Sequence, residues 1–149
     1  MIAIRPYRDQ DRATAARIWY AGWHSTGLAF AQQTSEAELF ERIGRELALG
    51  WSVFLAWDDE RPVGFLALRI AARCLDQLFL PPDRHGTGIG TALLDFAKEQ
   101  LPDGFWLRTS VDNRRACRFY EREGMIRGEE QTHPTLGHLT VINRWMGAE

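Results

Sequence analysis

The sequence predicts a mixed α/β fold in which helices flank a central, mostly antiparallel sheet. Three observations lead to this prediction. Apolar residues first recur at helical spacing and then, from Trp51, follow the spacing of strands. Two strand-like runs are separated by a short polar turn at residues 58–62, which is typical of an antiparallel hairpin. Later a strand, a helix and another strand follow one another closely, and this order indicates a β-α-β crossover.

The first strand and the first helix follow from short local patterns. Residues 2–5 alternate between apolar and polar side chains and stop at Pro6, which predicts a strand. Asp9 or Asp11 can then cap a helix, because a carboxylate accepts hydrogen bonds from the free N–H groups of a first turn. Helical spacing is shown by Ala15, Ala16, Trp19 and Trp23.

A second helix is expected before the chain turns to strands. Thr34 or Ser35 forms a capping box with Glu38, and the helix should run to about Leu49. Gly50 then closes it, because glycine readily adopts the left-handed conformation found at helix ends. Three strands are predicted next, at residues 51–57, 63–71 and 75–80.

The second half of the chain alternates helices with strands. The clearest helix, at residues 89–101, follows a glycine-rich turn. A shorter helix begins after Asp112 or Asn113, which can cap it, and ends at Gly124. The remaining strands are predicted at residues 105–111, 125–131 and 138–145. The predicted element order is therefore β-α-α-β-β-β-α-β-α-β-β.

Length and charge limit the kinds of protein and partner to be considered. A chain of 149 residues is expected to form a single domain, residues 1–149, with a sizeable hydrophobic core. The net charge is −2 and no basic face is predicted, so a nucleic-acid partner is not expected. No apolar run approaches the roughly 20 residues that span a bilayer, so no membrane partner is expected.

Cysteines and histidines give no sign of a metal site. Cys74 and Cys117 lack the spacing of metal ligands, and two cysteines are too few for a disulfide scaffold. His24, His133 and His138 show no metal-ligand spacing either. Because the first residues do not resemble a signal peptide, a reduced cytoplasmic location is expected.

The glycine-rich turn is the first candidate site. Residues 85–90 read His-Gly-Thr-Gly-Ile-Gly, between a predicted strand and a predicted helix. Exposed backbone N–H groups at a helix start attract anions, and the helix dipole adds to this attraction. The turn lacks the Gly-Lys-Ser/Thr of a Walker loop and the glycine spacing of a dinucleotide fingerprint. Phosphate binding is the hypothesis, and ordinary turn chemistry is the alternative.

Two motifs together resemble those of the GNAT family of acyl-CoA N-acyltransferases. The turn is similar to the family's Gln/Arg-x-x-Gly-x-Gly, with His85 in the place of Gln or Arg. Residues 111–125 resemble the segment Asn-x-x-Ala-x-x-Phe-Tyr-x-x-x-Gly-Phe, with Met125 in the place of the last aromatic residue. The predicted element order is also that of the GNAT fold. The matching residues of the second motif are Asn113, Ala116, Phe119, Tyr120 and Gly124.

The resemblance implies an acetyl-CoA-dependent N-acetyltransferase. The acetyl group would pass directly to a primary amine of a small molecule, or less readily to a protein or peptide N-terminus, in a ternary complex. Tyr120 would give a proton to the leaving thiolate, and His85 would contact a phosphate. The strand before the turn would pair with pantetheine. The implied cofactor-binding residues are Leu78, Phe79, Leu80, His85, Gly86, Thr87, Gly88, Ile89, Gly90, Thr91, Asn113, Ala116 and Tyr120.

The general base, the acceptor and the activity itself leave alternatives open. Asp76 is the acidic residue on the strand before the turn, so it is the candidate base; it can equally be a surface carboxylate. Trp23, His24 and Phe30 are expected to contact the acceptor, although Trp23 at i+4 from Trp19 can also belong to the core. The rival function is a non-catalytic acyl-CoA sensor. The resemblance also leaves a homodimer open.

Overall fold

The computed structural model describes residues 1–148 and contains a seven-stranded sheet. The strands are β1 (Ile2–Pro6), β2 (Ser52–Asp58), β3 (Arg61–Arg69), β4 (Cys74–Phe79), β5 (Phe105–Ser110), β6 (Ile126–Thr132) and β7 (Leu139–Trp145). Their order in the sheet is β1-β2-β3-β4-β5-β7-β6. All neighbours are antiparallel except β4 and β5, which are parallel because α4 crosses between them. The predicted fold class is thus confirmed.

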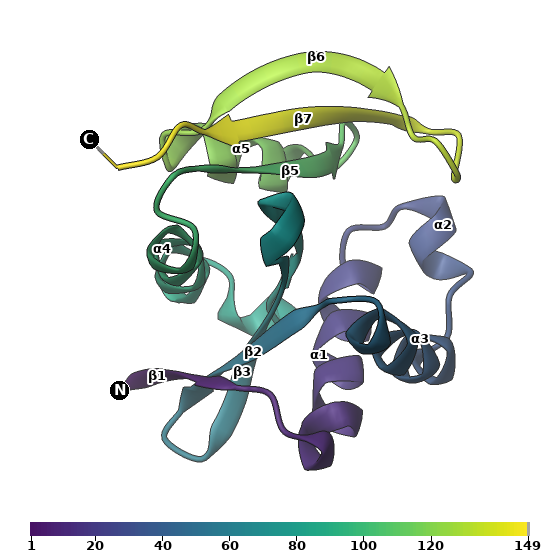
Figure 1. Ribbon diagram of the computed structural model, residues 1–149. Helices are drawn as coiled ribbons and strands as arrows, with labels where there is room; N and C mark the ends of the chain where they lie inside the picture. Colours follow the sequence, from purple (N-terminus) through teal and green to yellow (C-terminus); the bar gives the residue numbers. More distant parts are fainter. Residues whose placement is uncertain (149) are drawn as a thin grey trace.

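Helices cover both faces of the sheet. They are α1 (Arg12–His24), α2 (Ala29–Gln32), α3 (Glu36–Ala48), α4 (Ile89–Gln100) and α5 (Arg114–Arg122). Figure 1 shows α1 and α3 side by side, with α4 across the sheet from them. No helix within residues 1–148 is long and apolar enough to cross a membrane.

The predicted elements all have counterparts, with boundaries that differ by one or two residues. Ser35 caps α3 as predicted, because its hydroxyl accepts a hydrogen bond from the Glu38 N–H at 3.1 Å. The short helix α2 was not predicted, since four residues carry too little helical periodicity. The turn predicted at 58–62 is shorter in the structure: Asp58 pairs with Arg61 and leaves a two-residue hairpin loop.

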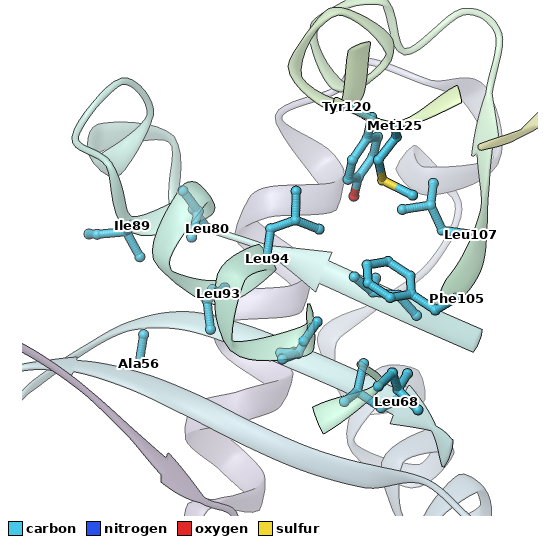
Figure 2. Packing of buried hydrophobic residues seen from close by; sticks show 14 of the residues in the cluster. Ala56, Leu68, Leu80, Ile89, Leu93, Leu94, Phe105, Leu107, Tyr120 and Met125 are labelled. Carbon is cyan, nitrogen blue, oxygen red and sulfur yellow. The ribbon is translucent and has the colours of Figure 1, made fainter. Parts of the chain in front are cut away.

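Two hydrophobic clusters lie on opposite faces of the sheet. One joins α1 and α3 to β2 and β3 around Trp19, Leu39 and Phe65, each at most 1% exposed. The other lies between α4, α5 and the centre of the sheet, and Figure 2 shows Leu94 and Tyr120 within it. Each large buried side chain contributes roughly 1.5–3 kcal/mol, so both sets of helices are fixed against the sheet.

The sheet opens between its two parallel strands. Only one pair of residues, Cys74 and Trp106, is in register between β4 and β5, and both lie at the starts of these strands. In Figure 1 the strands β5, β7 and β6 accordingly form an upper part, while β1, β2 and β3 lie below. Beyond the single pair the two strands diverge toward their C-terminal ends, and backbone groups there are left without a neighbouring strand.

Candidate functional site

Two hollows open where β4 and β5 diverge. The large hollow, of about 690 Å³, is bounded by the end of β4, the glycine-rich turn and α5. The small hollow, of about 240 Å³, is bounded by β4, β5, α1 and the turn between β6 and β7. Residues common to both are Leu78, Phe79, Asn113, Ala116 and Tyr120. A molecule in one hollow therefore meets a molecule in the other beside Tyr120.

The glycine-rich turn presents bare backbone to the large hollow. Gly86 and Gly88 have φ of +76° and +87°, which side chains rarely tolerate, and Gly88 is the N-cap of α4. A Cβ at either position would project into open space. Gly90 instead packs against the Phe119 ring, where a Cβ would lie 3.3 Å away. The free N–H groups at the start of α4 thus face a space that can hold an anion.

The large hollow is strongly cationic. Its lining includes the α5 side chains Arg114, Arg115, Arg118 and Arg122. The Arg115 guanidinium contacts His85 Nδ1, and the pKa of His85 is lowered by burial and then by the Arg115 charge. Arg84 contributes nothing here, because it pairs with Asp58 at 3.2 Å. The turn and these arginines fit a ligand that carries several phosphates.

The end of β4 is held by an unusually close helix contact. A Cβ on Gly22 of α1 would lie 2.7 Å from the Leu80 carbonyl oxygen and 2.9 Å from the Phe79 Cβ. Helix α1 therefore packs directly on the backbone of the strand end that lines both hollows. A glycine inside an amphipathic helix, such as Gly22, is a sequence signal of a close packing contact.

Tyr120 belongs to the hydrophobic core and also lines both hollows. Its side chain is 6% exposed and packs among Leu94, Leu107 and Met125, as Figure 2 shows. Burial raises the pKa of the Tyr120 hydroxyl well above its ordinary value, so this group stays protonated at neutral pH. Asn113 begins the same helix, and its Oδ1 accepts a hydrogen bond from the Ala116 N–H at 3.3 Å. This cap fixes the helix that carries Tyr120.

Neither cysteine has the environment of a nucleophile. Burial raises the pKa of Cys74, which lines the small hollow, to about 12. Burial also raises the pKa of Cys117, whose Sγ donates to the Ser110 carbonyl oxygen at 3.7 Å. Because the thiolate is the reactive form of cysteine, both side chains are unreactive at neutral pH.

Asp76 reaches the site through a β-bulge. Strict alternation predicts that Asp76 and Leu78 share a face of the sheet. The register between β3 and β4 passes from Gln77 directly to Leu75, so Asp76 is the extra residue of a bulge. The parity argument is therefore wrong for its side chain, although Asp76 does line the small hollow.

The Asp76 carboxylate is held by two donors. Its Oδ2 accepts hydrogen bonds from Trp51 Nε1 at 2.7 Å and from Arg69 Nε at 3.1 Å. Arg69 also pairs with Glu46 of α3. These contacts put the carboxylate on the α1 and α3 side of the sheet and fix its orientation.

Aromatic rings form one wall of the small hollow. Trp23 stacks on Trp19 at 6.4 Å and contacts Phe30 at 5.6 Å, centroid to centroid. Phe30 in turn stacks on His138 at 4.3 Å, and His138 stacks on His133 at 5.2 Å. Trp19, Trp23 and Phe30 all line the hollow, so the core and acceptor interpretations of the tryptophans are both compatible with their positions.

Some expected residues lie away from the two hollows. His24 is in neither lining; its Nε2 hydrogen-bonds the Thr34 carbonyl at 2.8 Å and its ring lies on Tyr20. The Ile89 side chain is buried in the core, and the Thr87 hydroxyl donates to the Arg84 carbonyl. The large hollow is lined by the other expected residues, which are Leu78, Phe79, Leu80, His85, Gly86, Gly88, Gly90, Thr91, Asn113, Ala116 and Tyr120.

Two arginines in the small hollow were missed from the sequence. Arg42 comes from α3 and Arg108 from β5, and both line the hollow. The sequence weakly indicated that Arg108 lies at the site. Arg108 is two residues from Trp106 and from Ser110, so all three share one face of β5. Arg42 is one of several charged residues on α3, so nothing in the sequence singled it out.

The fold, the cationic hollow and the sequence together place the chain among acyltransferases that take their acyl group from coenzyme A. Residues 14–125 match the Acetyltransferase (GNAT) family, and the chain belongs to that family. It is an acetyl-CoA-dependent acyltransferase, as the sequence resemblance implied.

Curated relatives agree with this assignment, and solved structures agree with the fold. The chain is 31% identical over 124 residues to Peptidyl-lysine N-acetyltransferase YjaB of Salmonella typhimurium, and the match covers 83% of each protein. The solution structure of apo YjaB from Escherichia coli has a TM-score of 0.76 at 24% identity and covers 99% of each chain. PaiA N-acetyltransferase from Thermoplasma acidophilum, solved with coenzyme A, has a TM-score of 0.74 at 20% identity and covers 97% of this chain and 99% of its own.

Proposed function

We propose that the chain transfers an acetyl group from acetyl-CoA to a primary amine of a small molecule, with both substrates bound at once. The observation that carries this proposal is the meeting of the two hollows beside Tyr120. The large hollow suits the cofactor and the small one suits the amine. Because both cysteines are buried thiols with raised pKa values, direct transfer is favoured over an acyl-cysteine route.

The large hollow would bind the cofactor through backbone and charge. The N–H groups around Gly88 at the start of α4 and the arginines of α5 would contact the phosphates. The backbone of Leu78, Phe79 and Leu80, beside the gap in the sheet, would pair with the pantetheine amides. Asn113 would contact the same arm. When bound, acetyl-CoA supplies the thioester from which the acetyl group is transferred.

Tyr120 and Asp76 are proposed to move the protons. Tyr120 stays protonated and stands where the hollows meet, so its hydroxyl is placed to donate a proton to the leaving sulfur. Among the described residues, Asp76 is the single acidic residue that lines the small hollow. It would take the proton of the amine, directly or through a water molecule, from the position that Trp51 and Arg69 fix.

A second candidate acceptor is a lysine side chain of a protein. The observation in its favour is the similarity to relatives named peptidyl-lysine N-acetyltransferases. A lysine stem could lie along the aromatic wall of Trp23 and Phe30. The sensor alternative is not favoured, because these relatives are named as enzymes.

An amine panel tests the proposal. Release of free thiol from acetyl-CoA is followed with small amines, amino acids and lysine peptides, and products are identified by mass spectrometry. We expect turnover of small amines with intersecting double-reciprocal lines, and full activity in Cys117→Ala. Tight acetyl-CoA binding without thiol release on any amine would favour a sensor. Parallel lines would contradict the ternary complex, and acetylation of peptides alone would favour the lysine acceptor.

A further inference from the structure

The small hollow contains two arginines that lack a carboxylate partner among residues 1–148. Arg42 and Arg108 are both half-buried and both line the hollow. Across residues 1–148, neither guanidinium has a carboxylate oxygen within 4.0 Å, although other arginines do. Within the described part of the chain, the Arg108 guanidinium donates a single hydrogen bond, to the Thr140 hydroxyl at 3.4 Å. Arg42 lies over the Trp19 ring, 5.2 Å from its centroid.

The two arginines line the same small hollow although they come from different elements, α3 and β5. His133, from the turn between β6 and β7, has its pKa lowered by burial and then by the charges of His138, Arg108 and Arg42. His133 itself lines the same hollow as the two arginines. Burial also lowers the pKa of Arg42, which shows that its guanidinium is partly removed from water. A partly desolvated cation is stabilised when an anion binds beside it.

The carboxylates nearby are already engaged by another arginine. Arg69 pairs with Asp76 at 3.1 Å and also with Glu46, so one guanidinium forms ion pairs with two carboxylates at the edge of the hollow. Asp76 also raises the pKa of Arg42, but it lies beyond ion-pair distance of it. The charge of Arg108 faces no acidic residue in the lining other than Asp76. The described part of the small hollow is therefore cationic as a whole.

The histidines add donors but no negative charge. His133 Nδ1 accepts hydrogen bonds from the N–H groups of Thr135 and Leu136 at 3.1 and 2.9 Å, so its proton is on Nε2. His138 lies between Phe30 and His133, and its Nδ1 is buried without a partner in residues 1–148. An aromatic wall beside two unpaired guanidinium groups matches an apolar or aromatic group joined to an anion.

We propose that Arg42 and Arg108 bind a carboxylate of the acceptor, and that the acceptor is an amino acid with an apolar or aromatic side chain. Its side chain would lie on Trp23 and Phe30, and its amine would point toward Tyr120. This inference rests on the proposed function, because it names the amine that the small hollow takes. Polyamines and lysine side chains without a nearby carboxylate would leave both arginines unpaired.

Matched pairs of amines test the inference by kinetics. L-phenylalanine is compared with phenethylamine, L-tryptophan with tryptamine, and L-leucine with isoamylamine. We expect kcat/KM to be roughly tenfold or more higher for the amino acid, as charge-assisted hydrogen bonds imply. Arg42→Gln and Arg108→Gln should lower kcat/KM for the amino acids and thereby remove this preference. Arg45→Gln, an exposed position on the same helix, should change nothing. Equal or better turnover of the simple amines in every pair would overturn the inference.

Binding without transfer separates this inference from the proposed function. Phenylacetate and phenylacetamide, which differ in charge but not in shape, are titrated into the protein saturated with coenzyme A and followed by calorimetry. We expect phenylacetate to bind, phenylacetamide to bind at least roughly tenfold more weakly, and both arginine variants to abolish the difference. If amines are acetylated but phenylacetate has no advantage, the carboxylate site is wrong. If phenylacetate binds but no amine is acetylated, the proposed function fails instead.

Discussion

At the residue scale, the environment of Tyr120 determines its chemistry. The same contacts that bury the ring also raise the pKa of the hydroxyl and keep its proton in place. An acid that protonates a leaving thiolate needs this combination of a held proton and a fixed position. Tyr120 is therefore part of the core and of the site, and the two roles separate only when the oxygen alone is removed.

Tyr120→Phe removes that oxygen and keeps the ring. We expect kcat to fall by roughly a hundredfold, since general acid catalysis typically contributes about 10²–10⁴. The Kd of acetyl-CoA should stay within about twofold, because the remaining contacts of the large hollow are untouched. Steady-state kinetics and calorimetric titration measure the two effects. An unchanged kcat, with chemistry shown to limit the rate, would remove the proposed role.

Sequence reasoning at this scale succeeded for residues tied to local motifs. The positions of Gly88 and Tyr120 in the site follow from a turn pattern and from helical spacing. It named Asp76 as a residue of the site for a reason that does not hold, because a β-bulge changes strand parity and leaves no trace in a single sequence. It also missed Arg42, since a charged residue on a helix surface has no pattern that separates a solvated arginine from one facing a hollow.

At the element scale, the start of α4 requires glycine at position 88 for two reasons, one conformational and one functional. Gly88 needs glycine for its φ of +87° and also for the open space in front of it. Gly124, after α5, has the same φ and equally open surroundings but lies outside both hollows. A side chain at either position would therefore be strained by the left-handed conformation. Only a side chain at Gly88 would also enter the large hollow.

Gly88→Ala and Gly124→Ala form a matched pair. Both should lower the free energy of unfolding by about 1 kcal/mol, because a side chain disfavours the left-handed conformation. Only Gly88→Ala should also weaken acetyl-CoA binding, by roughly tenfold or more, since its methyl group enters the anion space. Thermal unfolding and calorimetric titration of both variants check this. Equal affinities in the two variants would place the phosphates elsewhere.

The elements themselves were largely predictable, since their signals are local. The cap at Ser35 and the amphipathic spacing of α4 are written in neighbouring residues. The tight hairpin was not, because Asp59 adopts a left-handed conformation with φ of 54° that the sequence only weakly indicates. Short helix α2 was missed because four residues cannot establish a period.

At the scale of the whole molecule, the histidines couple folding to pH. The pKa values of His85, His133 and His138 are all lowered, in each case mainly by burial. In the unfolded chain these groups would bind protons near pH 6.5, while in the folded chain they do so only at lower pH. The unfolded chain then holds more protons between these values, so stability rises with pH across this window and falls as pH drops through it.

We therefore expect the Tm to fall by a few degrees between pH 7.5 and pH 5.5. His133→Gln should lower the Tm at pH 7.5, because two backbone N–H groups lose their acceptor. Its Tm should nevertheless depend less on pH than that of the unmodified protein. Calorimetric scans at constant ionic strength measure both effects. A Tm that is constant or rises toward pH 5.5 would contradict the assignment.

The single register pair between β4 and β5 has a consequence for how the sheet meets other molecules. Besides its outer edges, β1 and β6, the sheet has two partial inner edges where these strands part. Exposed edges invite another polypeptide to add as a strand. The inner edges differ from the outer ones, because they lie beside α1 and α5 within the two hollows. If the proposed function holds, the pantetheine arm of acetyl-CoA would pair with the inner edge at the end of β4 and complete the sheet for as long as it stays bound.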